Sequence, residues 1–211
     1  CDGMAATVED FIACFAESAG RDLSHFMRWY SQAGTPTLAV ASNYDASART
    51  FTLTLTQSSA PTPGQPVKQP LVIPVALGLV GANGDLPLTT KAAHEEGGAS
   101  LQECKSGVFE LDKPSRTIIF HNVAERPAPS ILRGFSAPVK LELDTSAEDL
   151  QTLAARDSDL FNRWQAIQTS ATRLLIGYVS TIRNGGVPGA DARICEALSN
   201  ALGAFASDPA F

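Results

Sequence analysis

The chain has 211 residues, of which 44% are hydrophobic and 7% aromatic, and it carries a formal net charge of −6 at pH 7. This composition is typical of a globular protein with one large or two small cores, and no run of about 18 apolar residues indicates a transmembrane helix. The charge is −3 over residues 1–33 (2 basic, 5 acidic), −1 over 34–144 (9 and 10) and −2 over 145–211 (5 and 7), which disfavours nucleic-acid binding because that function needs clustered Lys and Arg.

The cysteines and the first residues indicate the setting of the chain. Four cysteines lie far apart without a Cys-x-x-Cys pair, which favours free thiols in a reducing compartment over a disulfide framework: Cys1, Cys14, Cys104 and Cys195. No Asn-x-Ser/Thr sequon occurs, and we expect a cytoplasmic protein. The opening Cys1-Asp2-Gly3-Met4 is neither an initiator Met nor the start of a signal peptide, which predicts a piece of a longer chain.

Two short amphipathic helices are expected at the start of the chain. Thr7 can cap the first, with Glu9 and Asp10 in its positive first turn, and Gly20 ends it. Its apolar stripe consists of Val8, Phe11, Ile12 and Phe15. A second helix is expected over 22–32, with the stripe Leu23, Phe26, Met27 and Tyr30.

The end of the second helix marks the change from α to β structure. Asp22 is placed to cap this helix, Gly34 can stop it in the left-handed conformation, and Pro36 prevents its return. Two short helices bury little surface alone, so we expect them to pack on the following strands or on polypeptide outside the chain.

Residues 38–56 have the pattern of an antiparallel hairpin with one buried face. Leu38 and Val40 alternate with small residues, and residues 43–48 have the composition of a connection. The returning strand alternates threonines with large apolar residues, namely Phe51, Leu53 and Leu55.

Prolines and glycines mark the segments that follow. The proline-rich stretch 61–70 predicts a loop or sheet edge, and Pro74 inside the strand expected over 71–79 indicates an outer edge or a bulge. Asn83-Gly84 predicts a tight turn with positive φ angles. Residues 89–105 contain Gly97-Gly98 and several alanines, which predict a mobile surface loop.

Further short strands are expected at 108–111, 117–120, 130–135 and 139–143. About seven or eight strands between residues 36 and 143 match the size of an immunoglobulin-like sandwich of roughly 100 residues. We therefore predict an immunoglobulin-like antiparallel β-sandwich flanked by α-helical segments on both sides.

Helical spacing returns after residue 144. Thr145 with Glu148 predicts a capping box, and a long helix follows that ends near Asn184. Its apolar stripe consists of Phe161, Trp164, Ile167, Ala171, Leu174 and Tyr178. A further helix is expected from about Ala190, as in the first turns of a helical array.

The histidines give little support for a metal site. His94-Glu95 could begin a His-Glu-x-x-His zinc motif, but Gly98 stands in the place of the second histidine and the glycines disfavour a helix. A solvated loop histidine is the stronger interpretation. His25 beside an apolar stripe and His121 at a strand end are interpreted as structural or surface histidines.

No nucleophile with its base is recognisable. Cys14 lies among apolar helix residues, as an inert core thiol does, and Cys104 lies in the expected loop without a neighbouring histidine. Glu95-Glu96 has the character of a solvated charge cluster, and Trp29 and Trp164 on helical stripes predict core packing. Nucleophile-elbow, phosphate-loop and dinucleotide motifs are absent, so no catalytic, cofactor-binding or metal residue is predicted.

Three sets of short sequence motifs, spread over residues 1–180, match one protein family in the order in which the family has them. The first set is Asp2-Gly3, Ala5-Ala6-Thr7, Glu9-Asp10-Phe11 and Trp29-Tyr30-Ser31-Gln32-Ala33-Gly34-Thr35-Pro36. The second is Lys68-Gln69-Pro70, Ile73-Pro74 and residues 130–141, and the third is Phe161-Asn162-Arg163-Trp164. In this order they resemble the end of the catalytic domain, the small β domain and the start of the helical domain of bacterial aminopeptidase N, a family of zinc metallopeptidases.

The resemblance implies a fragment with three parts: 1–34 as catalytic-domain helices, 35–144 as the sandwich and 145–211 as the start of the helical domain. The zinc ligands, the motif that binds the substrate amine and the catalytic Tyr of the family all precede residue 1. The segment alone is therefore predicted to be inactive and to hold no cofactor, with zinc in the parent enzyme. Its implied partners are the missing domains of the same chain and the peptide substrates of the parent, and neither nucleic acid nor membrane.

Two functions are compatible with these patterns. The sandwich can be a structural connector that sets the distance and angle between the catalytic domain and a helical cap. Alternatively, it can be an independent module that binds peptide or carbohydrate, which requires an exposed aromatic platform or an edge groove on residues 36–143. Phe51, Phe109 and Phe120 lie in strand patterns that predict burial, which favours the connector.

Overall fold

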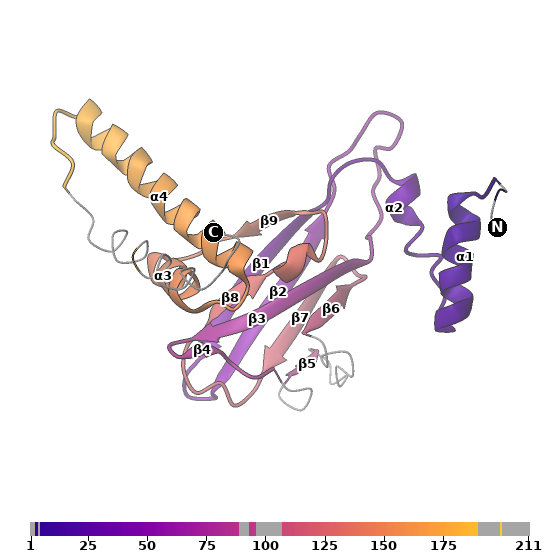
Figure 1. Ribbon diagram of the computed structural model, residues 1–211, viewed down its shortest axis with the longest axis horizontal. Helices are drawn as coiled ribbons and strands as arrows, with labels where there is room; N and C mark the ends of the chain where they lie inside the picture. Colours follow the sequence, from indigo (N-terminus) through magenta and orange to yellow (C-terminus); the bar gives the residue numbers. More distant parts are fainter. Residues whose placement is uncertain (1–2, 4, 89–92, 96–106, 190–198, 200–211) are drawn as a thin grey trace.

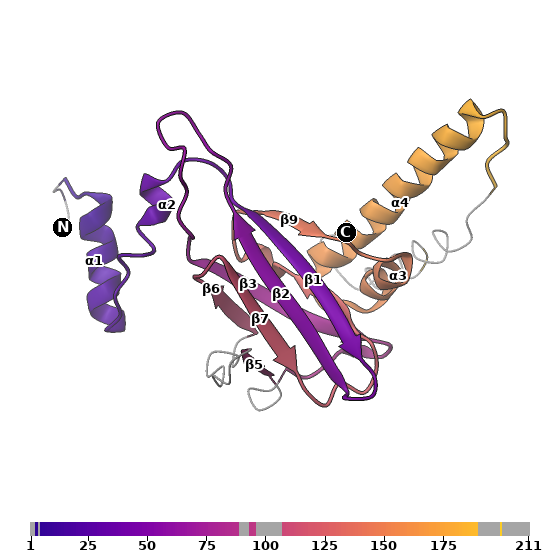
Figure 2. The same ribbon diagram turned by 180° about the vertical axis from the view of Figure 1, so that it is seen from behind.

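The computed structural model describes residues 3, 5–88, 93–95, 107–189 and 199. Helices α1 (Val8–Ala19) and α2 (Arg28–Ser31) precede a β-sandwich, and helices α3 (Ala147–Arg156) and α4 (Leu160–Arg183) follow it. Figures 1 and 2 show α1 and α4 on opposite sides of the strands. The predicted immunoglobulin-like sandwich between two helical regions is confirmed.

The sandwich consists of two sheets with the core between them. The five-stranded sheet has the order β5 (Ala93–Glu95), β7 (Ser115–Phe120), β2 (Thr50–Ser58), β1 (Thr37–Asp45) and β9 (Lys140–Leu143). In the second sheet, β3 (Ile73–Gly81) pairs with β4 (Gly84–Asp85), β6 (Val108–Leu111) and β8 (Ala128–Ile131). Fully buried side chains from both sheets form the core, among them Leu38, Phe51, Leu53, Ile73, Val75, Leu111 and Ile118.

The hairpin of β1 and β2 is confirmed as antiparallel, with Val40 opposite Leu55. Alternate residues of a strand face opposite sides of a sheet, so the large apolar residues of β2 enter the core while its threonines face outward. Thr54 Oγ1 lies 3.3 Å from Thr117 Oγ1 of β7 on that outer face. Phe51, Phe109 and Phe120 are buried, as the strand patterns predict.

Strands β6 and β7 belong to different sheets although only residues 112–114 join them. The buried side chain of Gln57 stabilises this crossing. Its amide donates to the backbone oxygens of Leu71 (2.8 Å), Leu111 (3.1 Å) and Lys113 (2.9 Å), and its carbonyl accepts from Leu71 N at 2.8 Å. A buried amide without hydrogen bonds would cost about 1–3 kcal/mol, so Gln57 can be buried where the chain crosses between the sheets only because its amide is paired.

Two expected strands differ in position or direction. Strand β8 ends at Ile131 and does not reach 135, because Leu132 has a φ of 59° and the short 3₁₀ helix η2 (Arg133–Phe135) follows. Strand β9 runs parallel to β1, with Thr37 opposite Lys140, so the predicted antiparallel sandwich contains one parallel pair at this edge. The connection between β1 and β9 passes through the other strands of the sandwich, which satisfies the need of parallel strands for a long crossover.

Pro74 lies in β3 without breaking its ladder. The amide of Ala76, two residues further and on the same side of the strand, donates to Ser136 Oγ at 3.0 Å and not to β6. The missing amide of Pro74 therefore also faces away from β6, as the outer-edge interpretation requires. Gly84, the first residue of β4, has a φ of 112° as expected for the tight turn, but Asn83 does not have a positive φ, so that expectation holds only for the glycine.

Part of the expected loop over 89–105 is a strand. Residues 93–95 form β5, which pairs antiparallel with β7, Ala93 lying opposite Phe120. The loop prediction is wrong for these three residues, because pairing with β7 overrides the low strand propensity of the local sequence Ala93-His94-Glu95. The remainder of the loop lies outside the described residues.

Helix α1 has its expected start but not its expected burial. Thr7 Oγ1 accepts from Asp10 N (3.2 Å) and Asp10 Oδ2 accepts from Thr7 N (2.9 Å), which forms a capping box. Of the apolar stripe only Ile12 is buried. Phe11 and Phe15 are exposed and contact each other edge to face, with ring centroids 4.9 Å apart.

The second helix is much shorter than expected. Asp22 accepts hydrogen bonds from the amide (2.8 Å) and hydroxyl (2.9 Å) of Ser24, which forms a local turn in place of a helix cap. Only Arg28–Ser31 are helical, so the prediction over 22–32 is wrong in its first half. The helix ends at Ser31 and its C-cap is Gln32, which is extended with a φ of −105°, so the prediction that Gly34 stops the helix is wrong, although Gly34 does have a positive φ of 100°.

The helices after the sandwich keep their predicted order. The capping box of α3 is formed by Ser146 and Asp149, one residue later than predicted for Thr145 and Glu148, because both pairs have the required spacing and only the backbone path distinguishes them. Helix α4 extends to Arg183, close to the expected end, and the helix expected from Ala190 lies outside the described residues. No described helix combines the length and the apolarity that crossing a bilayer requires.

Candidate functional site at the junction of the sandwich and the helices

The sequence candidates for metal binding are separated in the structure. His94 and Glu95 lie in β5 and not in a loop, which corrects that interpretation. His25 is half-buried, its Nε2 2.9 Å from Pro70 O and 2.8 Å from Arg28 Nη1, as expected of a structural histidine. Among the described residues, no group of three or more His, Cys, Asp or Glu side chains is placed to hold a metal ion, so this part of the chain does not fit the zinc that the resemblance implies.

The remaining candidates have mixed outcomes. Cys14 is exposed, so its prediction as a core thiol is wrong, whereas Cys1, Cys104 and Cys195 lie outside the described residues. Trp29 packs against the core as predicted, and its Nε1 donates to Val72 O at 2.7 Å. Trp164 is 49% exposed and contacts Phe161, so its predicted burial is wrong.

A polar cluster around Arg133 joins the second sheet to the start of α4. The guanidinium forms a bidentate pair with Asp85 of β4 (2.6 and 2.9 Å) and donates to Asp157 Oδ1 at 2.7 Å. Its Nε donates to Ser130 Oγ of β8 at 2.8 Å. The Arg133 side chain is only 17% exposed and that of Asp157 is fully buried, so these charges are shielded from solvent.

The pKa values of the two carboxylates in this cluster are shifted in opposite directions. Burial raises the pKa of Asp157 above its ordinary value, although Ser130, the Asp159 amide and Arg133 act against the increase. For Asp85, burial also raises the pKa, but hydrogen bonds from Arg133 and Ser158 outweigh it and the pKa is lowered. Asp157 Oδ2 is buried and accepts no hydrogen bond, so its ionised form depends on Arg133.

Glycine at position 78 makes room for this arrangement. Gly78 lies in β3 beneath Arg133, and a Cβ atom there would overlap the guanidinium carbon and both terminal nitrogens. A second link runs through Asp159, whose Oδ2 accepts from Gly134 N (2.9 Å) while its Oδ1 caps α4 by accepting from Asn162 N (2.9 Å). The start of α4 is therefore fixed to η2 by the same side chain that caps it.

A second ion pair fixes α3. Arg126, in the segment before β8, forms a bidentate pair with Asp149 (2.7 and 2.9 Å), which is also the third residue of the α3 capping box. Burial alone would raise the pKa of Asp149, but hydrogen bonds from Arg126 and Ser146 outweigh it and lower the pKa. A small apolar core lies beside the pair and contains Val80, Ala128, Leu150, Leu153, Ala154, Ala166 and Ile167.

The joint at the other end of the sandwich is more exposed. Arg21 forms a bidentate pair with Glu110 of β6, but the Arg21 side chain is 54% exposed. Gln32 and Gln69 exchange two hydrogen bonds of 2.8 and 3.1 Å, and both residues lie at the surface or half-buried. Lys68 Nζ donates to Ala33 O at 2.8 Å.

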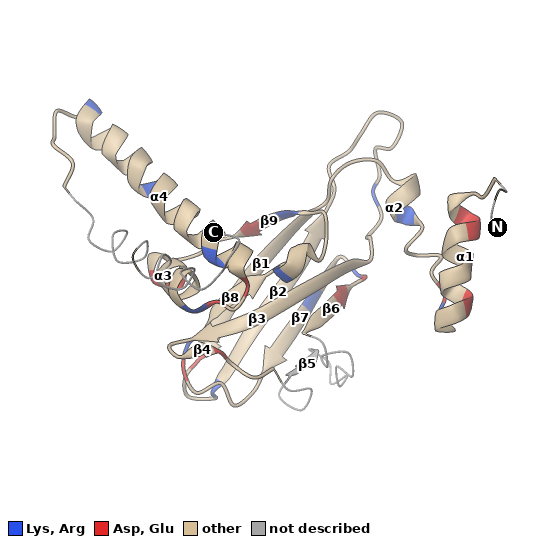
Figure 3. Cartoon of the chain, viewed as in Figure 1, with Lys and Arg blue, Asp and Glu red and all other residues tan. Residues whose placement is uncertain are grey.

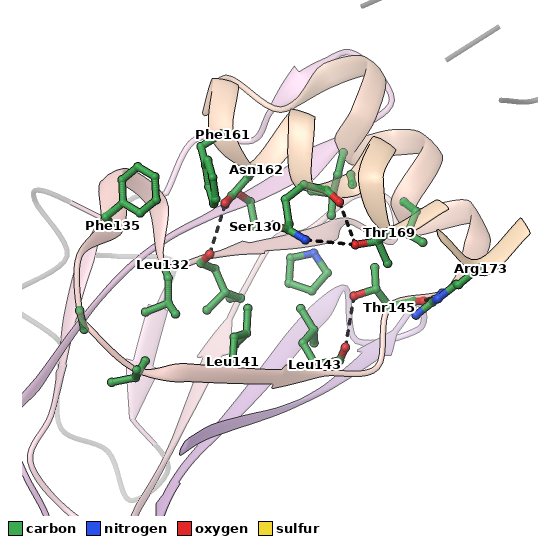
Figure 4. Close-up of a pocket in the computed structure, with 18 residues that line it drawn as sticks. Ser130, Leu132, Phe135, Leu141, Leu143, Thr145, Phe161, Asn162, Thr169 and Arg173 are labelled. Atoms are coloured by element: carbon green, nitrogen blue, oxygen red, sulfur yellow. Dashed lines mark hydrogen bonds between the residues drawn. The ribbon is translucent and has the colours of Figure 1, made fainter. Parts of the chain in front are cut away.

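An open pocket of about 480 Å³ lies next to the Arg133 cluster (Figure 4). Its walls come from β8, η2, β9, α3 and the first half of α4. Phe135 and Phe161 stand together at one end of Figure 4, with ring centroids 4.4 Å apart, and Arg173 stands at the other end. Outside the pocket, Figure 3 shows basic and acidic residues dispersed over separate elements.

The sequence patterns did not single out Arg133, Asp157, Arg126 or Asp149. Their ion-pair partners lie 23 to 48 residues apart in the chain, a separation that no local pattern reveals. The available signal was the run Asp157-Ser158-Asp159 before an apolar helix, which marks a helix start but not its partner.

Comparisons with known proteins agree with this geometry. Residues 34–144 match the profile of the family described as Domain of unknown function (DUF3458), Ig-like fold, and residues 147–211 match DUF3458_C, described as ARM repeats. The chain is 45% identical over 212 aligned residues to aminopeptidase N of Caulobacter vibrioides, which covers all of this chain and 22% of that protein. It is 38% identical over 168 residues to aminopeptidase N of Escherichia coli, covering 80% of this chain and 18% of that protein.

A solved structure has the same fold. Legionella pneumophila aminopeptidase A, crystallised in complex with aspartic acid, superposes with a TM-score of 0.68 at 24% identity, over 99% of this chain and 21% of that one. The resemblance seen in the sequence strings is thus confirmed, and the chain spans only about a fifth of the length of these relatives.

Proposed function

We propose, because the chain belongs to the DUF3458 family with its Ig-like fold, that it is the connector of a zinc-dependent aminopeptidase. In this role the sandwich sets the position of the helical region relative to a catalytic domain that lies on polypeptide outside these 211 residues. The parent enzyme would remove N-terminal amino acids from peptides in the cytoplasm.

The observation that carries this proposal is the shielded joint at the C-terminal end of the sandwich. Arg133 and Arg126 each form a bidentate ion pair with a carboxylate, and those carboxylates come from β4 and α3. Bidentate arginine pairs restrict orientation as well as distance, and burial protects Arg133, whose side chain is 17% exposed, from screening, whereas Arg126 is 46% exposed and only its partner Asp149 is buried. Such a joint transmits the position of the sheet to α3 and α4, which is what a connector must do.

The zinc of the proposed parent has no ligand set in the described part of the chain. When bound elsewhere in the parent, it would polarise the scissile carbonyl and activate water. The residues here act on the joint and take no part in that chemistry.

The first test concerns activity of the segment itself. The purified 211-residue chain is expected to leave aminoacyl anilides uncleaved. Hydrolysis by this chain that a chelator abolishes would contradict the proposal, because it would place the metal centre within the segment.

The second test concerns the joint in the full-length parent. Arg133→Met is expected to lower kcat/KM for an aminoacyl anilide, since the helical region loses its fixed position, while the zinc content stays unchanged. Arg183→Met, an exposed residue in the last turn of α4, serves as the control. Equal activity of both variants and wild type would refute the connector role.

A further inference from the structure

The pocket between β9 and α4 has the dimensions of a small-molecule site that the connector role does not require. Its volume of about 480 Å³ lies within the range of roughly 300–1,000 Å³ that is usual for ligand pockets. The floor consists of aliphatic side chains, namely Leu132, Val139, Leu141, Leu143, Leu150 and Leu153. An apolar ligand body would be covered there on several sides.

The side-chain donors of Asn162 and Thr169 along the middle of the pocket are already engaged. Asn162 donates its side-chain amide hydrogens to Ser130 Oγ (2.8 Å) and Ile131 O (3.2 Å), and the Thr169 hydroxyl donates to Gln165 O (2.8 Å). A peptide backbone at this depth needs partners for its own amides and carbonyls. A hydrocarbon chain needs none, so it fits this wall better than a peptide does.

Arg173 gives the pocket one charged end. Its Nη1 donates to Thr145 O at 2.7 Å, which holds the side chain at the pocket mouth and uses one of its five donors. Arg173 is the one charged residue among the described residues that line the pocket. A guanidinium in this position complements a carboxylate, to which it can donate two parallel hydrogen bonds.

We propose that this pocket binds a medium-chain fatty carboxylate. The carboxylate lies against Arg173, and the hydrocarbon tail follows Leu143 and Leu141 towards Phe135 and Phe161 at the opposite end (Figure 4). Because the pocket is lined by both the sandwich and the helices, the bound ligand contacts both sides of the joint.

Decanoate titrated into the 211-residue chain by calorimetry tests the head-group contact. We expect saturation at one equivalent, and a loss of affinity of about tenfold or more in Arg173→Gln, because a charge-assisted pair is removed. Arg173 is exposed, so this variant should keep its melting temperature. Arg183→Gln on the same helix should bind like wild type, and decyltrimethylammonium, with an equal tail and opposite charge, should bind about tenfold more weakly or not at all.

Phe135→Asn tests the direction of the tail. Phe135 is 70% exposed and has a φ of 56°, which asparagine tolerates, so the fold should persist. Decanoate should bind severalfold more weakly to this variant, whereas hexanoate, with a shorter tail, should lose less affinity. The proposal is overturned if Arg173→Gln binds decanoate like wild type, if the cationic surfactant binds equally well, or if Phe135→Asn leaves decanoate binding intact. Binding of many equivalents, insensitive to Arg173, would show adsorption to exposed apolar helix faces and would also overturn it.

Discussion

The two ends of the sandwich are attached to their helices in different ways. At the C-terminal end, Arg133 is 17% exposed and its partner Asp157 is fully buried, and an apolar core continues from the sheet into α3 and α4. At the N-terminal end, the Arg21–Glu110 pair lies at the surface and the apolar stripe of α1 is mostly exposed. Both joints use an arginine and a carboxylate, yet only one shields them from water.

This difference indicates which helices are fixed to the sandwich. A surface ion pair contributes about 0–1 kcal/mol, whereas breaking a buried one costs about 3–5 kcal/mol because a charge remains without its partner. The helices after the sandwich are therefore held firmly, whereas α1 before it is held only loosely within this segment. Four substitutions test this contrast between the two joints.

The largest effect is expected for Arg133→Met. The change leaves Asp157 buried without its cation, and the free energy of unfolding in urea should fall by about 3–5 kcal/mol. Arg183→Met, at the exposed end of α4, should change it by less than about 0.5 kcal/mol. If the two variants are equally stable, the C-terminal joint is not the stronger one.

Gly78→Ala should have the next largest effect. The new methyl group overlaps the guanidinium of Arg133, and we expect a loss of about 2–3 kcal/mol in the same denaturation experiment. Gly177→Ala is the matched control, because a Cβ at Gly177 meets nothing within 4 Å and alanine favours helix α4 by about 1 kcal/mol. If Gly78→Ala leaves the free energy of unfolding unchanged, the guanidinium of Arg133 can move away from β3 without destabilising the fold, which would contradict the prediction.

Asp149→Asn tests the Arg126 pair through pH. The pKa of Asp149 in the folded protein lies below its ordinary value of 3.8, so its ionised form stabilises the fold above that value and this contribution is lost as pH falls through the folded pKa. At about pH 6 the variant should be less stable than wild type by about 1–3 kcal/mol. The gap should narrow as the pH is lowered towards about 2, because wild-type Asp149 becomes protonated. A gap that stays constant over this range would contradict the assignment.

The smallest effect is expected for Arg21→Gln at the N-terminal joint. The pair with Glu110 is exposed to solvent, so its loss should cost less than about 1 kcal/mol, and salt near 1 M should reduce the difference further by screening. A loss as large as that of Arg133→Met would erase the contrast between the two joints.

Local sequence patterns predicted where helices and strands occur better than they predicted which residues cap or cover them. The prediction of Thr7 as the cap of α1, made from the acidic residues of the first turn, is confirmed, and the structure adds a capping box with Asp10. For α3 the spacing of a capping box predicted Thr145, but Thr145–Glu148 and Ser146–Asp149 have the same spacing, and Ser146 is the cap in the structure. The burial of Trp164 was also misjudged, because a helical stripe shows which residues share a face but not whether anything covers that face.

The order of α, β and α segments, the alternating core face of β2 and the end of α1 at Gly20 followed from the sequence alone, because they depend on the period of side chains and on local φ angles. Only the tertiary structure decided that β6 and β7 enter different sheets, that β9 runs parallel to β1, and that Arg133 meets both Asp85 and Asp157. These contacts join residues far apart in the chain, and their energies depend on burial, which exists only after the sheets have packed.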